Sequence, residues 1–129
     1  MILLDTHLAL WSMMGHSKLS RRAIHEIEAS DAVFFSAISL VEITIKHARG
    51  NASPDPIPVN AQQAAEEFRR AGFQELDFTS SHAEMMDRLP PIHRDPFDRM
   101  LVAQALSEPM RFLTHDAALA AYSQLVEVV

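Results

Sequence analysis

Two patterns of apolar and polar residues alternate along this chain. Segments with a pattern typical of strands are followed by segments with a pattern typical of helices. Short apolar runs predict strands at residues 2–5, 32–36, 74–78, 111–114 and 125–129. Helical spacing predicts helices at residues 7–14, 20–29, 39–49, 60–72, 81–89, 96–108 and 117–123. Regular alternation of this kind favours an α/β fold with a mostly parallel central sheet.

Capping residues predict where several of the helices begin. Ser39-Leu40-Val41-Glu42 and Ser81-His82-Ala83-Glu84 both match the capping box, in which an acid reaches back to the first amide of its helix. Asp95 suits an N-cap, because Pro96 follows it at the first helical position. Three of the seven prolines fall within residues 51–59, which predicts a long surface loop there.

Composition narrows the class of protein. With 129 residues, 48% apolar and 22% charged, the chain is expected to form one globular domain over residues 1–129. The absence of cysteine excludes disulfides and thiolate metal sites. No basic leader precedes the first apolar run, and no run approaches the length of a membrane span, so we expect no membrane association and a cytoplasmic location.

The formal net charge of −6 bears on possible nucleic-acid partners. Domains that hold nucleic acid by bulk electrostatics usually carry a basic face. Any nucleic-acid role of this chain must therefore depend on a few placed cations, or on metal bound among its acids.

Four acids fall where a predicted strand gives way to a helix: Asp5, Glu42, Asp98 and Asp116. If the strands are parallel neighbours, these acids converge at the carboxyl edge of one sheet. Two like charges about 4 Å apart repel by about 4 kcal/mol at an effective dielectric of about 20. A hard divalent cation such as Mg²⁺ or Mn²⁺ offsets this repulsion and prefers oxygen ligands. Such an ion can activate water for attack on a phosphodiester.

Each of these acids also has a structural interpretation without metal. Glu42 would complete a capping box, Asp98 would favour the positive end of a helix dipole, and Asp5 and Asp116 would cap helices. Each contact of this kind contributes about 1 kcal/mol. The joint occurrence of four acids at strand ends favours the metal site, whereas Asp95 is explained by capping and is left outside the site.

The residues around these acids resemble a known family. Four segments carry the resemblance, in the order and spacing typical of that family: Asp5-Thr6-His7-Leu8-Ala9-Leu10-Trp11, Ser36-Ala37-Ile38-Ser39-Leu40-Val41-Glu42-Ile43-Thr44-Ile45-Lys46, His93-Arg94-Asp95-Pro96-Phe97-Asp98-Arg99-Met100-Leu101-Val102-Ala103-Gln104-Ala105 and Leu113-Thr114-His115-Asp116. Together they resemble PIN-domain proteins, particularly VapC-type toxins of toxin–antitoxin pairs, and they span nearly the whole chain.

The resemblance implies a three-layer α/β/α PIN domain with a four- to five-stranded sheet. It implies a Mg²⁺- or Mn²⁺-dependent endoribonuclease that cleaves RNA, is inhibited by a cognate antitoxin, and forms a homodimer and a higher assembly with that antitoxin. Asp5 and Asp98 would be the principal metal ligands, assisted by Glu42 and Asp116. The hydroxyls of Thr6 and Thr114 could orient metal-bound water.

Other residues near these segments admit more than one role. Lys46 lies four residues after Glu42, which favours an ion pair over a contact with phosphate. Arg99 could hold a carboxylate, approach a phosphate or form a salt bridge. Trp11, with Met13 and Met14, forms an apolar patch that suits core packing or a partner.

The sequence departs from the subfamily pattern at three positions. Val41 stands where Trp is frequent, Asn51 stands where Lys is common, and His115 stands where a basic residue is frequent. None of these positions is one of the four acids. The departures therefore concern packing and the RNA-binding surface, not the metal ligands.

Two other functions are compatible with these residues. A structure-specific DNA nuclease of the same superfamily is one, because no residue recognisably reads a 2′-hydroxyl. A catalytically inactive PIN-like binding module is the other, with the acids serving only as caps. A phosphatase or phosphoacceptor domain is disfavoured, because Asp5-Thr6-His7 lacks the paired acids of such sites.

Overall fold

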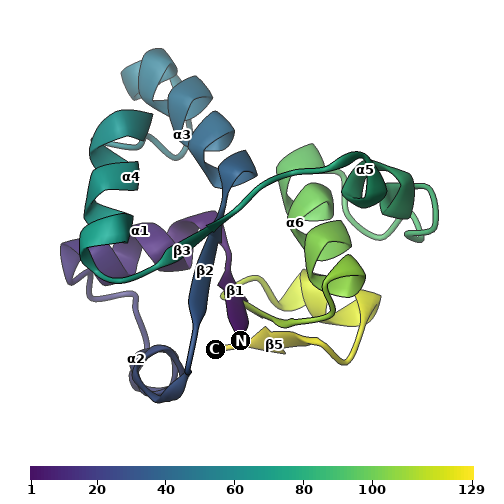
Figure 1. Cartoon of the computed structure of the whole chain (residues 1–129). Coiled ribbons are helices and arrows are strands. Elements are labelled where there is room, and N and C mark those ends of the chain that lie inside the picture. The colour runs from purple at the N-terminus through teal and green to yellow at the C-terminus, as the bar shows by residue number, and fades with distance from the viewer.

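The centre of the structure, a computed structural model that describes residues 1–129, is a five-stranded parallel sheet (Figure 1). Its strands lie in the order β3-β2-β1-β4-β5. Their bounds are Ile2–Leu4 for β1, Val33–Ser36 for β2, Gln74–Leu76 for β3, Arg111–Thr114 for β4 and Val126–Val128 for β5. The mostly parallel sheet of four to five strands predicted from the sequence is therefore confirmed, with all its pairs parallel.

β1 is the middle strand, and it runs between β2 on one side and β4 on the other. Ile2 pairs with Val33 of β2 and with Arg111 of β4, so the strand order reverses at β1. All three residues of β1 are fully buried, which is why this strand is apolar without alternation. In parallel sheets a reversal of strand order leaves a crevice at the carboxyl ends of the strands.

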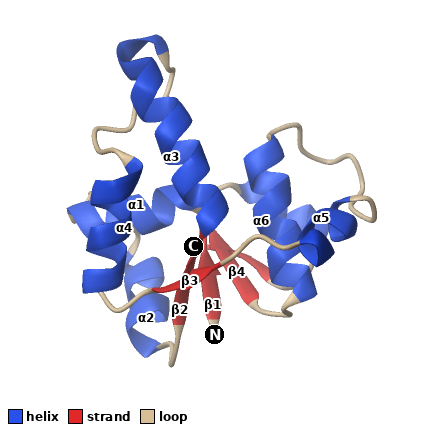
Figure 2. Cartoon of the chain, turned by 45° about the horizontal axis from the view of Figure 1, so that its top comes forward, coloured by secondary structure: helices blue, strands red, loops and turns tan.

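Helices cover both faces of the sheet, and two 3₁₀ turns follow α3 and β4 along the chain. Their bounds are Thr6–Met14 for α1, Arg21–Ala29 for α2, Ala37–Arg49 for α3, Gly50–Ala52 for η1, Ala61–Arg70 for α4, Ser80–Met86 for α5, Pro96–Ser107 for α6 and Ala117–Tyr122 for η2. Figures 1 and 2 show α1, α3 and α4 on one side of the sheet and α5 and α6 on the other.

Two apolar cores correspond to these two faces. Ile2 and Leu4 of β1 belong to the core beneath α1–α4, whereas Leu3 belongs to the core beneath α5, α6 and η2. Successive strand residues point to opposite faces, so three consecutive apolar residues supply both cores. The three-layer α/β/α architecture follows from this arrangement, and it confirms the predicted fold class.

Two helices, α3 and α5, begin at other residues than the predicted capping boxes indicate. α3 begins at Ala37, because β2 runs directly into it and the Ser36 hydroxyl accepts a hydrogen bond from the Ile38 amide at 3.0 Å. The predicted capping box of Ser39 and Glu42 is therefore wrong, since both residues lie inside the helix. α5 is capped by Thr79 together with His82, so the predicted box from Ser81 to Glu84 is also wrong.

The remaining elements differ from prediction mainly at their ends. The loop predicted over residues 51–59 begins with the short turn η1, and the helix predicted over 117–123 is a 3₁₀ turn. The strand predicted over 74–78 is shorter, ending at Leu76. None of the helices is long and apolar enough to cross a membrane.

An aromatic pair anchors the core on the α1–α4 side and generates a stability prediction. Phe35 of β2 and Phe68 of α4 are fully buried, with ring centroids 5.0 Å apart. Replacing Phe68 by Ala leaves a cavity, so we expect Phe68→Ala to lower the free energy of unfolding by about 3–5 kcal/mol in urea titrations. Val41→Ala at a half-exposed position should change it by less than about 0.5 kcal/mol. Equal effects of the two substitutions would contradict this assignment of the core.

Candidate functional site

The carboxyl edge of the sheet holds a polar cleft of about 240 Å³, in which no lining residue is apolar. The four predicted acids all line this cleft, although they come from distant parts of the chain. The complete lining is Asp5, Thr6, His7, Glu42, Lys46, Asp55, His93, Asp95, Asp98, His115 and Asp116. The expected convergence of acids at one sheet edge is therefore observed.

Asp5 follows β1 directly and is held by a dense set of hydrogen bonds. One of its oxygens accepts from the Leu8 amide at 2.7 Å, which caps α1. The other accepts from the Thr114 hydroxyl at 2.5 Å and from the His115 amide at 3.3 Å. Burial opposes ionisation of Asp5, but the bonds from His115, Thr114 and Leu8 outweigh it and hold its pKa below the usual value.

These bonds also determine what the two predicted threonine hydroxyls do. The Thr114 hydroxyl donates to Asp5, and the Thr6 hydroxyl donates to Ser39 at 2.8 Å. Both hydroxyls therefore donate to protein oxygens, and their expected role in orienting a metal-bound water stays a prediction. Thr114 positions the Asp5 carboxylate, and Thr6 ties the start of α1 to α3.

Glu42, on α3, has one satisfied and one unsatisfied oxygen. Its Oε2 lies 2.7 Å from Nζ of Lys46, which confirms the predicted i,i+4 pair. Its Oε1 is buried and has no hydrogen-bond partner. Burial lowers the pKa of Lys46, but its bond to Glu42 outweighs that effect and raises the pKa above the usual value. An unsatisfied buried carboxylate oxygen is destabilising, so Glu42 carries an open ligand position in a cleft of acids.

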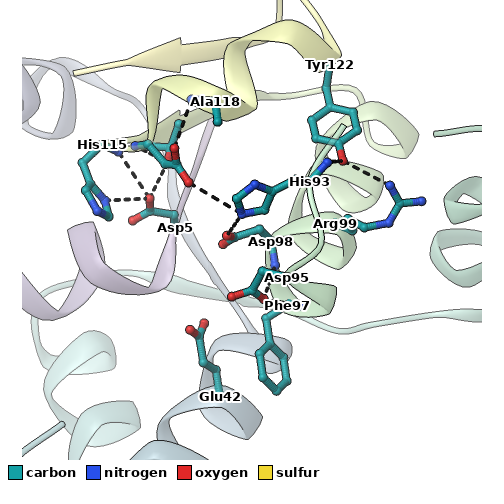
Figure 3. Close-up of polar contacts among 12 residues, drawn as sticks. Asp5, Glu42, His93, Asp95, Phe97, Asp98, Arg99, His115, Ala118 and Tyr122 are labelled. Atoms are coloured by element: carbon teal, nitrogen blue, oxygen red, sulfur yellow. Dashed lines mark hydrogen bonds and ion pairs between the residues drawn. The ribbon is translucent and has the colours of Figure 1, made fainter. Parts of the chain in front are cut away.

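Asp98 and Asp116 both lie close to His93, which was not predicted as a site residue. Figure 3 shows His93 beside Asp98. Nε2 of His93 lies 2.9 Å from an Asp98 oxygen and 3.7 Å from an Asp116 oxygen. One ligand atom from each of these three residues lies within 4.8 Å of the others. The sequence offered only one signal for His93, its place in the third segment that resembles the family, because no second histidine lies at helical spacing from it.

The loop that carries His93 is fixed by Arg99 and Tyr122. The Tyr122 hydroxyl accepts from the His93 amide at 2.9 Å and from Arg99 at 3.1 Å, and Arg99 also donates to the Pro90 carbonyl at 3.0 Å. Arg99 contacts no carboxylate and does not line the cleft, so the carboxylate contact and salt bridge considered for it from the sequence are not observed. It positions the His93 loop.

Asp98 experiences the repulsion that the sequence predicted. Burial, followed by the charges of Asp95, Glu42 and Asp5, raises its pKa to about 7, and His93 only partly opposes this shift. Asp95 is the N-cap of α6, as expected, and accepts from the Phe97 amide at 2.8 Å. It nevertheless lines the cleft, so its charge contributes to the site although it was left outside.

Two further cleft residues were not predicted from the sequence. Asp55 comes from the proline-rich loop and contacts His7, and its carboxylate lies 3.9 Å from Nζ of Lys46. His115 lies 3.3 Å from Asp5, and this hydrogen bond raises the pKa of His115 against the effect of its partial burial. The cleft therefore combines acids with imidazoles at its rim.

The donor chemistry fits a divalent cation. Carboxylate oxygens predominate, as Mg²⁺ and Mn²⁺ require, and one imidazole nitrogen lies within the tightest group of ligand atoms. The unpartnered oxygen of Glu42 supplies an independent indication, because a buried acceptor without a donor suits a cation. Asp98, Asp116 and His93 would hold such an ion most directly, and Asp5 and Glu42 line the same cleft.

A parallel α/β domain with acids gathered where its strand order reverses belongs to a recognisable class of domains. The PIN domain family matches residues 2–125 of the chain. Ribonuclease VapC22 of Mycobacterium tuberculosis is 34% identical over 121 residues, which cover 92% of this chain and 88% of that protein. The chain therefore belongs to the PIN-domain family, and its resemblance to VapC-type proteins is confirmed.

Solved structures of low sequence identity share the fold. VapBC2 from Rickettsia felis, bound to a DNA fragment from its promoter, has a TM-score of 0.68 at 14% identity, covering 99% of this chain and 98% of that one. VapC20 from Mycobacterium tuberculosis, a toxin that cleaves the sarcin–ricin loop, has a TM-score of 0.57 at 19% identity, covering 94% of both chains. At these identities the likeness establishes the fold.

The raised pKa of Asp98 predicts how stability depends on pH without metal. Its folded-state pKa of about 7 exceeds the ordinary value of 3.8, so the stability present below about pH 4 is lost as the pH rises to about 7. At pH 8 in EDTA, Asp98→Asn should therefore raise stability by about 1–2 kcal/mol, a melting-temperature increase of roughly 3–8 °C.

The pH dependence of this difference distinguishes it from a general effect of removing charge. The advantage of Asp98→Asn should disappear near pH 4, where the wild-type carboxyl is protonated. Asp31→Asn, at an exposed position, serves as the matched control and should show no such trend. Calorimetry across this pH range checks the prediction, and a variant less stable than wild type at pH 8 would refute it.

Proposed function

We propose that this protein is a divalent-metal-dependent endoribonuclease of the VapC type. The observation that carries the proposal is the convergence of Asp5, Glu42, Asp98 and Asp116 in one cleft, with an unpartnered buried oxygen on Glu42. The relative that is 34% identical is named a ribonuclease, which supports RNA as the substrate. Mg²⁺ or Mn²⁺ is the proposed cofactor, on the chemistry of the carboxylate donors.

Each cleft residue has a defined role in this proposal. Asp98 and Asp116 would hold the ion together with His93, whose nitrogen lies 2.9 Å from Asp98 and 3.7 Å from Asp116. Asp5 presents a carboxylate that Thr114 and His115 keep in place and ionised. Glu42 directs its free oxygen into the same cleft, while Lys46 balances its charge.

A bound divalent ion would lower the pKa of a water molecule and offset the charge that develops on the phosphodiester. The protein supplies the negative charges that hold the ion, and its hydrogen bonds fix those charges before substrate arrives. The positions of Asp5 and His93 are each set by two or more partners, so little reorganisation is needed at the moment of reaction.

Partners and location form part of the same proposal. The structural neighbours include a toxin–antitoxin complex from Klebsiella pneumoniae and FitAB bound to an IR36 DNA fragment. On this analogy a cognate antitoxin would inhibit the enzyme, a homodimer would be its basic assembly, and the cytoplasm would be its compartment. These remain predictions for this chain.

Cleavage assays test the proposed activity. Purified protein with Mg²⁺ or Mn²⁺ should cleave single-stranded RNA, and EDTA should abolish the reaction. Asp98→Asn should reduce kcat/KM by about 10²–10³-fold, because a ligand that stabilises developing charge contributes several kcal/mol. Cleavage that survives both EDTA and the substitution would refute the metal-dependent mechanism.

The same assay distinguishes the alternatives. A flap DNA substrate, offered in parallel with RNA, would be cleaved preferentially by a structure-specific DNA nuclease. A binding module would cleave neither substrate and would be unaffected by Asp98→Asn. Asp31→Asn is the charge-matched control and should retain full activity, because this exposed residue lies outside the cleft.

His93 provides a test of the ligand set that does not depend on cleavage. His93→Gln should weaken metal binding by about 10–100-fold, measured by the concentration of Mn²⁺ needed to raise the melting temperature. His25→Gln should leave that concentration unchanged, because His25 is exposed on α2 and does not line the cleft. Equal metal dependence in His93→Gln and wild type would exclude His93 from the ion's surroundings.

A further inference from the structure

Beside the acidic cleft lies a cluster of four aromatic rings, which we call the aromatic strip: His7, Trp11, His16 and His115. Trp11 is at its centre. The ring centroid of Trp11 lies 4.7 Å from that of His115, 5.6 Å from that of His16 and 5.8 Å from that of His7. The rings of Trp11 and His16 are stacked, with an angle of 25° between their planes.

The strip is built by the turn that ends α1. Gly15 takes a left-handed conformation with φ of 60°, which reverses the chain. The reversed backbone allows the His16 amide to bond to the Trp11 carbonyl at 3.0 Å, and this contact brings His16 back over Trp11. The Lys18 amide then bonds to Nδ1 of His16 at 3.0 Å, and Nζ of Lys18 lies 5.7 Å from the Trp11 ring centroid.

The strip borders a notch of about 130 Å³ between α1, the turn after it, and residues 55–58. His7 and Asp55 line both this notch and the acidic cleft, so the two hollows adjoin each other. His115 also lies between the acidic cleft and the aromatic strip. It contacts Asp5 at 3.3 Å, and its ring packs against the ring of Trp11. His115 therefore bridges the Trp11 ring and the Asp5 carboxylate of the proposed metal site.

Core packing explains only part of this arrangement. Trp11 packs against the core beneath α1–α4, but it is only partly buried and also lines the open notch. Lys18 is exposed, and His16 is only partly buried, so the core does not require these two residues beside the indole. A rigid aromatic surface with a cation next to it is typical of sites that stack nucleobases.

We propose that this notch is a subsite for one nucleobase of a single-stranded nucleic acid, next to the phosphodiester that the acidic cleft engages. The inference rests on the proposed nuclease function and adds a base-binding surface to it. Phosphates that flank the scissile bond are repelled by the acids, and the net charge of −6 offers no general attraction. Stacking on Trp11 supplies affinity that does not depend on charge, and Lys18 supplies one cation at the far side of the notch.

The fluorescence of Trp11 reports on this subsite directly, because Trp11 is the only tryptophan in the chain. The titration uses the Asp98→Asn variant with Mg²⁺, so that a short single-stranded RNA is bound without rapid cleavage. The RNA should quench the fluorescence in a saturable way. An abasic oligomer with the same number of phosphates should not, since it carries the charge without the bases.

Substitutions separate stacking from packing. In the same background, Trp11→Leu should weaken binding of a dye-labelled RNA about tenfold, which corresponds to about 1.4 kcal/mol. It should not change binding of the abasic oligomer, and Trp11→Phe should restore most of the affinity for RNA. Phe73→Leu is the matched control, because this partly buried aromatic packs in the same core but outside the notch and should leave binding unchanged.

The outcomes distinguish this inference from the proposed function. Cleavage by the wild type without base-dependent quenching would overturn the subsite and leave the nuclease intact. Base-dependent quenching without cleavage by the wild type would support the subsite and refute the nuclease. Equal loss of RNA and abasic binding in Trp11→Leu, or a loss of equal size in Phe73→Leu, would show that Trp11 acts only through packing and would overturn the proposal.

Discussion

Repulsion among carboxylates at the sheet edge is the constraint on which the rest of this structure depends. Burial and the nearby charges of Asp95, Glu42 and Asp5 together raise the pKa of Asp98. The fold tolerates this because each charge has an individual anchor. Hydrogen bonds hold Asp5, Lys46 pairs with Glu42, and the first amides of α6 bind Asp95. The fold thus holds in place a cluster of acids that favours a cation over an empty cleft.

Much of the fold was predictable because its signals are local. The apolar run Ile2–Leu4 reads as a strand buried on both faces, and β1 has that environment. Asp95 and Pro96 predict the start of α6, where the cap is observed. Asp5, Glu42, Asp98 and Asp116 were predictable as a set because parallel strands bring their carboxyl ends together, and all four line one cleft.

What the sequence did not predict depends on tertiary contacts. Glu42 fits a capping box by spacing alone, but β2 continues directly into α3, so the helix begins earlier and Glu42 faces the cleft. His93 joins the site only because Tyr122 and Arg99 fix its loop. Asp55 arrives on a proline-rich loop whose path no periodicity describes. The positions of His93 and Asp55 required tertiary contacts that no local pattern encodes.

The bonds from Thr114 to Asp5 and from Tyr122 to His93 have a consequence for biosynthesis. Asp5 lies near the start of the chain, yet its carboxylate is held by a residue 109 positions later. The His93 amide likewise donates to the hydroxyl of Tyr122, which lies in η2, the last turn before β5. During translation, the acids of the first half emerge long before the residues that orient them. A ribosome-bound fragment that ends before Thr114 lacks both anchors, and one that ends before Tyr122 still lacks the second, so the nascent chain acquires its ordered site only as synthesis nears completion.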